Sequence, residues 1–231
     1  MCSSNYLITS NQKTHFLSFY WLLRLKYTQN QIGKSWKKLL ENGSIIEITF
    51  HGRGGQTSVT ASELLAELAF VRGFKDALAI PIIGAERRGS PVQAFTKLSK
   101  NRPIKTYDSV INPDYILIFD VSLLKIPRIK ASIKEGVTIL ADSDKPLNTS
   151  ELPENVKIYV VDATGICIKR QFMHASGPIL NIPMLGAFGK VTGFYNLEVM
   201  EKVIKKQFGE KKSEKNMIVA KDAYESVKEV Q

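Results

Sequence analysis

Residues Glu47 to Arg72 read EITFHGRGGQTSVTASELLAELAFVR, and this stretch decides the fold. Apolar and polar residues alternate over 46–50, which is the period of a short, half-buried strand. The glycine loop Gly52–Gln56 follows, and beyond it Ser58 or Thr60 can cap a helix. The apolar face of that helix is formed by Leu64, Leu65, Leu68 and Ala69. The stretch therefore predicts a strand, a glycine loop and a helix, in that order.

Strand, glycine loop and helix form an arrangement that binds anions, most often phosphates, through backbone N–H groups and the helix dipole. The candidate contacts are Gly52, Arg53, Gly54, Gly55 and Gln56. Gly52 and Gly54 match the first two positions of G-x-G-x-x-G. Thr57 stands at the third, where glycine would allow close packing of helix and strand. We expect Thr57 to hold the helix slightly further off or to change the loop, and a plain strand–helix turn is the alternative.

A second apolar strand is predicted over 76–82. A dinucleotide-binding fold would place an acid near its end for the ribose hydroxyl, but here the chain continues with GAERRGSP over 84–91. Arg87 and Arg88 could hold a 2′-phosphate, another phosphate or the carboxylates of a partner. The alternative is a solvated turn.

Further strands are predicted over 92–98, 115–119, 137–141 and 158–161. The last three are nearly continuous apolar runs, which are typical of parallel strands covered on both faces. Asp120, Asp142 and Asp162 follow them directly, at the end of the sheet where open α/β folds keep their ligand crevice. The alternative is that each aspartate caps the helix or turn after it. The pattern predicts an α/β protein, a three-layer Rossmann-like fold with a largely parallel sheet.

The last third of the chain is predicted to be helical, with helices over 181–192, from Asn196 to Phe208, and over 212–230. Gly186, Ala187 and Gly189 are small residues that permit another element to approach the first of these helices closely. That element could belong to this fold or to a partner. Lysine and glutamate balance over 212–230, which favours a solvated amphipathic helix.

The 231 residues carry a formal net charge of +10, but the basic excess is uneven. Residues 1–43 hold six Lys or Arg against one acid, so we predict a basic leader 1–43 outside a core domain 44–231. Its apolar run, HFLSFYWLLRLKY over 15–27, is too short to span a bilayer. A helix or coil is favoured, and translation that begins near Ser44 is the alternative. Two distant cysteines, Cys2 and Cys167, favour a reducing, cytoplasmic location.

The segments HGRGGQ, ERRGSPV, YILIFD, VDAT and MLGAFGKVTG, in this order and spacing, resemble the gamma subunit of pyruvate and other 2-oxoacid:ferredoxin oxidoreductases. The resemblance extends from about Ile45 to the C-terminal helix. The combination of HGRGGQ with ERRGSPV is much more specific than either segment. Thr57 departs from the pattern, because the family usually has glycine there.

The resemblance implies a subunit that is inactive alone. Such enzymes decarboxylate a 2-oxoacid on thiamine diphosphate, pass electrons through [4Fe–4S] clusters to ferredoxin and deliver the acyl group to coenzyme A. This chain has no G-D-G…N motif for thiamine diphosphate and Mg²⁺ and no cysteine array for a cluster. These cofactors are therefore expected on alpha, beta and delta (ferredoxin-like) subunits or fused equivalents. Coenzyme A is expected at the glycine loop, and no catalytic or metal-binding residue is assigned to this chain.

Two other function classes are the alternatives. A free-standing NADP-binding reductase would use the glycine loop with Arg87 and Arg88, and of the three histidines only His51 lies beside the loop in sequence. A basic nucleic-acid-binding module should show aromatic residues among Lys and Arg on one face, and outside the leader this pattern is missing. We therefore expect neither a nucleic-acid partner nor a membrane.

Overall fold

Strand β1 (Ile46–Arg53) lies inside a seven-stranded sheet in the computed structural model, which describes residues 45–82, 88–148, 150 and 152–230. The strands follow the order β2-β3-β1-β4-β5-β6-β9. The other bounds are β2 (Asp76–Pro81), β3 (Pro91–Ser99), β4 (Tyr115–Ile118), β5 (Thr138–Asp142), β6 (Lys157–Val161) and β9 (Lys228–Glu229). Strands β1, β4, β5 and β6 are parallel, and antiparallel strands flank them. The predicted α/β fold is confirmed in this form.

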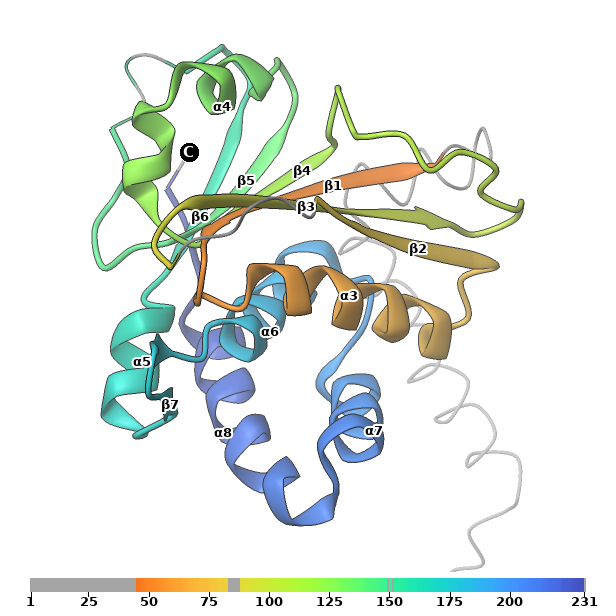
Figure 1. Cartoon of the computed structure of the whole chain (residues 1–231), viewed down its shortest axis with the longest axis vertical. Coiled ribbons are helices and arrows are strands. Elements are labelled where there is room, and N and C mark those ends of the chain that lie inside the picture. The colour runs from red at the N-terminus through yellow and green to blue at the C-terminus, as the bar shows by residue number, and fades with distance from the viewer. Residues whose placement is uncertain (1–44, 83–87, 149, 151, 231) are drawn as a thin grey trace, which may run out of the picture.

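Helices cover both faces of the sheet, which makes the three layers visible in Figure 1. On one face lie α3 (Ser58–Arg72) and α6 (Asn181–Thr192), and their apolar side chains share a core cluster with β1 and β4. The opposite face of β4, β5 and β6 packs against the segment that contains the 3-10 helix η1 (Val121–Lys125) and α4 (Pro127–Ser132). The predicted leader 1–43 lies outside the described residues, so the division at residue 44 stays a prediction.

Strand β1 is longer than the predicted 46–50, because it pairs with β3 as far as Arg53 opposite Pro91. Gly52 therefore belongs to the strand. A Cβ atom at Gly52 would lie 2.5 Å from Ser58 Oγ, so this glycine lets the start of α3 pack closely on the strand. A glycine at position 57 would be expected to allow this close packing of helix and strand. In this protein Gly52 allows it instead.

The three aspartates after the parallel strands accept hydrogen bonds from the first turns of helices. Asp120 accepts a hydrogen bond from the Ser122 N–H at 2.9 Å and begins η1. Asp162 accepts from the Gly165 N–H at 2.7 Å and begins α5 (Ala163–Lys169). Asp142 accepts from the N–H and the hydroxyl of Thr164 at 3.0 and 2.5 Å. The capping alternative is confirmed for Asp120 and Asp162, whereas Asp142 bonds the first turn of α5, which follows the next strand along the chain.

The C-terminal third contains α6, α7 (Leu197–Phe208) and α8 (Glu210–Ser226). The expectation of a solvated helix over 212–230 is wrong in two respects. The helix ends at Ser226, since Lys228 and Glu229 form the edge strand β9 beside β6. In addition, α8 buries Val219, Ala220 and Ala223 against the core cluster.

Gly186 on α6 faces the backbone of α8. A Cβ atom at Gly186 would lie 2.3 Å from the carbonyl oxygen of Ala220. The element that approaches the small-residue helix is therefore part of this fold.

Candidate functional site

The turn between β1 and α3 is held against the start of β3. The Gly54 N–H donates to the Ser90 carbonyl at 2.9 Å, and the Gly89 N–H donates to the Gly54 carbonyl at 3.1 Å. The Gln56 side-chain oxygen accepts from the Arg53 N–H at 2.8 Å. Gly55 has φ of +98°, a left-handed value that favours glycine. The N–H of Gly54 is therefore committed within the protein and is not free for an anion.

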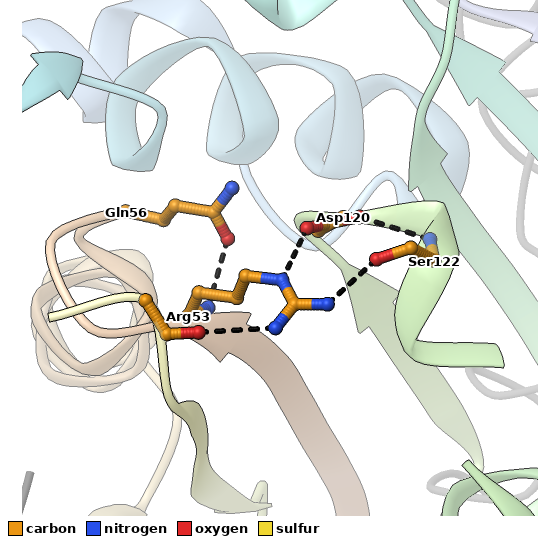
Figure 2. A network of polar contacts seen from close by, with 5 residues as sticks. Arg53, Gln56, Asp120 and Ser122 are labelled. Carbon is orange, nitrogen blue, oxygen red and sulfur yellow. Dashed lines mark hydrogen bonds and ion pairs between the residues drawn. The ribbon is translucent and has the colours of Figure 1, made fainter. Parts of the chain in front are cut away.

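The Arg53 side chain joins three segments (Figure 2). Its Nε donates to Asp120 at 2.5 Å, and its two terminal nitrogens donate to Ser122 Oγ at 2.7 Å and to the Gly89 carbonyl at 3.0 Å. Burial alone would raise the pKa of Asp120, but hydrogen bonds from Ser122 and Arg53 outweigh it and hold this pKa below its usual value. Arg53 thus fixes the loop to η1 and to the β2–β3 connection.

Thr57 takes the left-handed conformation, with φ of +61°, and is the N-terminal cap residue of α3. No side-chain hydrogen bond caps this helix, so the prediction of Ser58 or Thr60 as cap is wrong. Instead, Thr57 Oγ1 accepts from the Asn181 N–H at 3.0 Å, at the first residue of α6. The loop keeps the backbone that a glycine would adopt, and the threonine hydroxyl stabilises a helix 124 residues away in sequence.

This arrangement gives a prediction for Thr57. A left-handed β-branched residue is strained by about 1–3 kcal/mol, and one hydrogen bond contributes about 1 kcal/mol. Thr57→Val keeps the strain and removes the bond, so we expect a loss of about 1 kcal/mol in the free energy of unfolding. Thr57→Gly removes both, and the greater freedom of glycine in the unfolded chain costs about 0.5–1 kcal/mol, so we expect stability close to wild type. Urea denaturation of the full chain measures both, and a valine variant as stable as wild type would refute the role of the hydroxyl.

The loop pocket is a cavity of about 270 Å³ at the start of α3. It is lined by Arg53, Gly54, Gly55, Thr57, Ser58, Val59, Val92, His174 and Ser176. Among the described residues, no hydrogen bond is formed by the N–H groups of Gly55, Ser58 or Val59. The hydroxyl of Ser58 is buried and also lacks a hydrogen-bond partner in the described part of the chain. Unpaired donors at a helix N-terminus make this pocket suited to an anion.

Of the predicted arginine pair, the structure describes only Arg88. Arg87 lies outside the described residues. Arg88 is exposed, and its guanidinium donates to the Ala175 carbonyl at 3.4 Å, next to His174 and Ser176 of the loop pocket. Strand β3 separates β2 from β1, so the arginine approaches the loop through the β2–β3 connection.

His174 and Ser176 were missed by sequence reasoning as lining residues. They belong to a small hairpin of β7 (Met173–His174) and β8 (Gly177–Pro178), which the fold brings to the loop. No local sequence pattern marks them, because their approach depends on the long-range packing of α5 and α6.

His51 lies on the side of β1 opposite to Ile48 and Phe50, which pack into the core cluster with α3. It does not line the loop pocket. Burial, and secondly the charge of Arg128, lowers the pKa of His51 to about 4. Its Nε2 has no hydrogen-bond partner among the residues described. The histidine that the NADP-reductase alternative requires is therefore neutral at pH 7 and does not line the pocket.

Two features are absent from the described residues. These residues contain no group of three or more His, Cys, Asp or Glu side chains placed to hold a metal ion. None of their helices combines the length and apolar character that a membrane crossing requires.

Comparison with known proteins gives consistent matches. The family described as pyruvate ferredoxin/flavodoxin oxidoreductase matches residues 47–226, which run from the second residue of β1 to the end of α8. Pyruvate synthase subunit PorC of Methanothermobacter marburgensis is 41% identical over 184 residues, 80% of this chain and 98% of that protein. The pyruvate/ketoisovalerate oxidoreductases common subunit gamma of Pyrococcus furiosus is 39% identical over 186 residues, 78% and 96% of the two chains. The crystal structure of pyruvate oxidoreductase subunit PORC from Thermotoga maritima superposes with a TM-score of 0.68 at 34% identity, over 81% of this chain and 99% of that one.

Proposed function

The chain belongs to the pyruvate ferredoxin/flavodoxin oxidoreductase family as a gamma subunit, and from this premise we propose that its loop pocket contacts coenzyme A in the assembled enzyme. The enzyme oxidatively decarboxylates pyruvate or another 2-oxoacid, transfers the acyl group to coenzyme A and reduces ferredoxin. The gamma chain supplies a Rossmann-like surface on the side from which coenzyme A enters.

One observation carries the coenzyme A assignment. The unpaired N–H groups of Gly55, Ser58 and Val59 belong to residues that line the loop pocket at the start of α3. The positive end of the helix dipole and these donors favour a phosphate oxygen. Arg88 lies at the rim and adds a positive charge. Gly52, Gly54, Gly55 and Gln56 shape the loop, Arg53 positions it through Asp120, and Arg87 is proposed to add charge.

The remaining chemistry is assigned to partner chains. We propose that alpha and beta subunits hold thiamine diphosphate with Mg²⁺, and that a ferredoxin-like delta subunit carries [4Fe–4S] clusters, or that fused equivalents do so. Ferredoxin accepts the electrons. We place the complex in the cytoplasm, and assign it neither a nucleic-acid partner nor a membrane.

The test of the loop is a kinetic comparison in the assembled complex. Gly54→Val places a branched side chain beside the pocket and should block close approach of the ligand to the backbone. We expect the apparent KM for coenzyme A to rise about tenfold or more, with a much smaller change for the 2-oxoacid. Arg88→Gln should raise it less, by roughly three- to tenfold, because one exposed charge-assisted bond is lost.

Arg72→Gln is the matched control. Arg72 is also an exposed arginine, but it lies in the last turn of α3, at the opposite end from the loop pocket. Its neutralisation should leave the kinetics of coenzyme A unchanged. Unchanged coenzyme A kinetics in Gly54→Val, in a complex that assembles normally, would show that the loop is only structural.

A further inference from the structure

A second and larger cavity adjoins the loop pocket. Its volume is about 620 Å³, within the range typical of small-molecule sites. Thr57 and His174 line both cavities, so the two are neighbours. We call it the lysine pocket, after Lys211, Lys212 and Lys215, which line it from α8.

The three lysines create an unusually positive site. Lys211 and Lys215 are four residues apart and Lys212 and Lys215 three apart, spacings at which like charges on a helix repel. Lys211 and Lys212 also lie in the first turn of α8, where the helix dipole disfavours cations. All three are exposed, and in the described part of the chain none has a carboxylate partner. A bound anion would relieve each of these unfavourable interactions.

Two lysines near the end of α7, unlike the three of the lysine pocket, have carboxylate partners. Lys205 pairs with Glu201 at 3.0 Å and with Glu210 at 2.9 Å. Lys206 pairs with Glu67 at 2.8 Å. Glu210, the one acid in the first turn of α8, is therefore already engaged by Lys205. Of the lysines between 205 and 215 in the described part of the chain, those of the lysine pocket are the ones without a carboxylate partner.

Part of the lining of this pocket is apolar. Phe172, Ile179 and Phe208 line the pocket and pack against the core cluster. Asn181 and Asn216 add amide groups, and the Asn216 side-chain nitrogen donates to the Lys212 carbonyl at 2.7 Å. A ligand that matches both kinds of lining carries several negative charges at one end and a flat, weakly polar ring at the other.

We propose that the lysine pocket binds a nucleoside polyphosphate group, with the phosphates at Lys211, Lys212 and Lys215 and the base against Phe172 and Phe208. The group has two sources, a free adenine nucleotide or the nucleotide end of coenzyme A. Only the second source rests on the proposed function, because coenzyme A would then extend into the loop pocket past Thr57 and His174.

The test is calorimetric titration of the full chain at about 0.15 M salt with ATP, ADP, adenosine and coenzyme A. ATP and ADP should bind, and adenosine should bind at least about tenfold more weakly, since it lacks the phosphates. Lys211→Glu and Lys215→Glu should each weaken ATP binding about tenfold or more. Lys202→Glu is the matched control, because it makes the same change in net charge at an exposed position of α7 outside the pocket.

The outcomes separate the two sources and also separate this proposal from the loop assignment. If coenzyme A competes with ATP and Lys215→Glu weakens both, the pocket takes the nucleotide end of coenzyme A. If Lys215→Glu weakens ATP alone, the ligand is a free nucleotide. If ATP fails to bind, or if Lys215→Glu and Lys202→Glu bind it equally, the proposal is overturned. Failure of the loop assignment would appear instead as an unchanged KM for coenzyme A in Gly54→Val.

Discussion

We expect Gly186→Ala to lower the free energy of unfolding by about 3 kcal/mol, although alanine is the better helix former by about 1 kcal/mol. The added Cβ would lie 2.3 Å from the Ala220 carbonyl oxygen, and real Cβ atoms do not approach so closely. The obstructing atom is backbone in the middle of α8, so no side-chain rotation relieves the contact. The two helices must move apart, which opens the core around Ala220 and Ala223. Gly186→Leu should be more severe and should prevent folding of the chain.

Thermal and urea unfolding of the purified chain measure this effect. Lys202→Ala, at an exposed position of α7, is the control for a change to alanine in a helix. Its stability should stay within about 0.5 kcal/mol of wild type. A Gly186→Ala variant as stable as wild type would mean that α6 and α8 do not pack at this distance.

The second large effect that we expect is a fall in the free energy of unfolding when the pH is lowered. His51 has a pKa of about 4 in the folded protein and about 6.5 when unfolded. Between these values the unfolded chain binds a proton that the folded chain does not, so stability falls as the pH is lowered. The difference corresponds to a loss of about 3 kcal/mol between pH 6.5 and pH 4, and stability above pH 6.5 is unaffected.

His51→Gln removes this titration. The difference in unfolding free energy between wild type and variant isolates the histidine, because the carboxylates titrate in both. That matters for Asp142, whose pKa is raised, chiefly by burial, and which therefore contributes to stability with the opposite pH dependence. We expect the wild type to lose stability relative to His51→Gln by about 1.4 kcal/mol for each pH unit between these two pKa values. Parallel stability curves over this interval would contradict a buried, neutral His51.

Local patterns in the sequence were sufficient for most of the architecture. The parallel strands were predictable because continuous apolar runs report burial on both faces, and the α6 helix was predicted with the bounds observed. The burial of α8 was not predictable, because its polar composition hides a narrow apolar face that packs on α6. The antiparallel place of β3 between β1 and β2 depends on long-range pairing, which alternation alone does not reveal.

The presence of a pocket at the glycine loop was predictable, but its detailed contacts were not. The glycine loop does form a pocket at a helix N-terminus, as the strand–loop–helix pattern indicates. The roles of individual residues came from distant contacts. Arg53 is hydrogen-bonded to Asp120, Gly54 to Ser90 and Thr57 to Asn181. In each case the partner lies at least 36 residues away in sequence. A motif specifies which residue types stand in the loop, whereas the fold decides which of their groups remain free.

The central claim is that this chain is one subunit of a 2-oxoacid:ferredoxin oxidoreductase and is required for the reaction with coenzyme A. Reconstitution tests it most directly. Viologen reduction by pyruvate and coenzyme A is measured for the purified chain, for the partner subunits and for the two combined. We expect no activity and no iron–sulfur absorbance from the chain alone, and full coenzyme A-dependent activity only from the combination. Turnover of pyruvate by the purified chain alone would contradict the account.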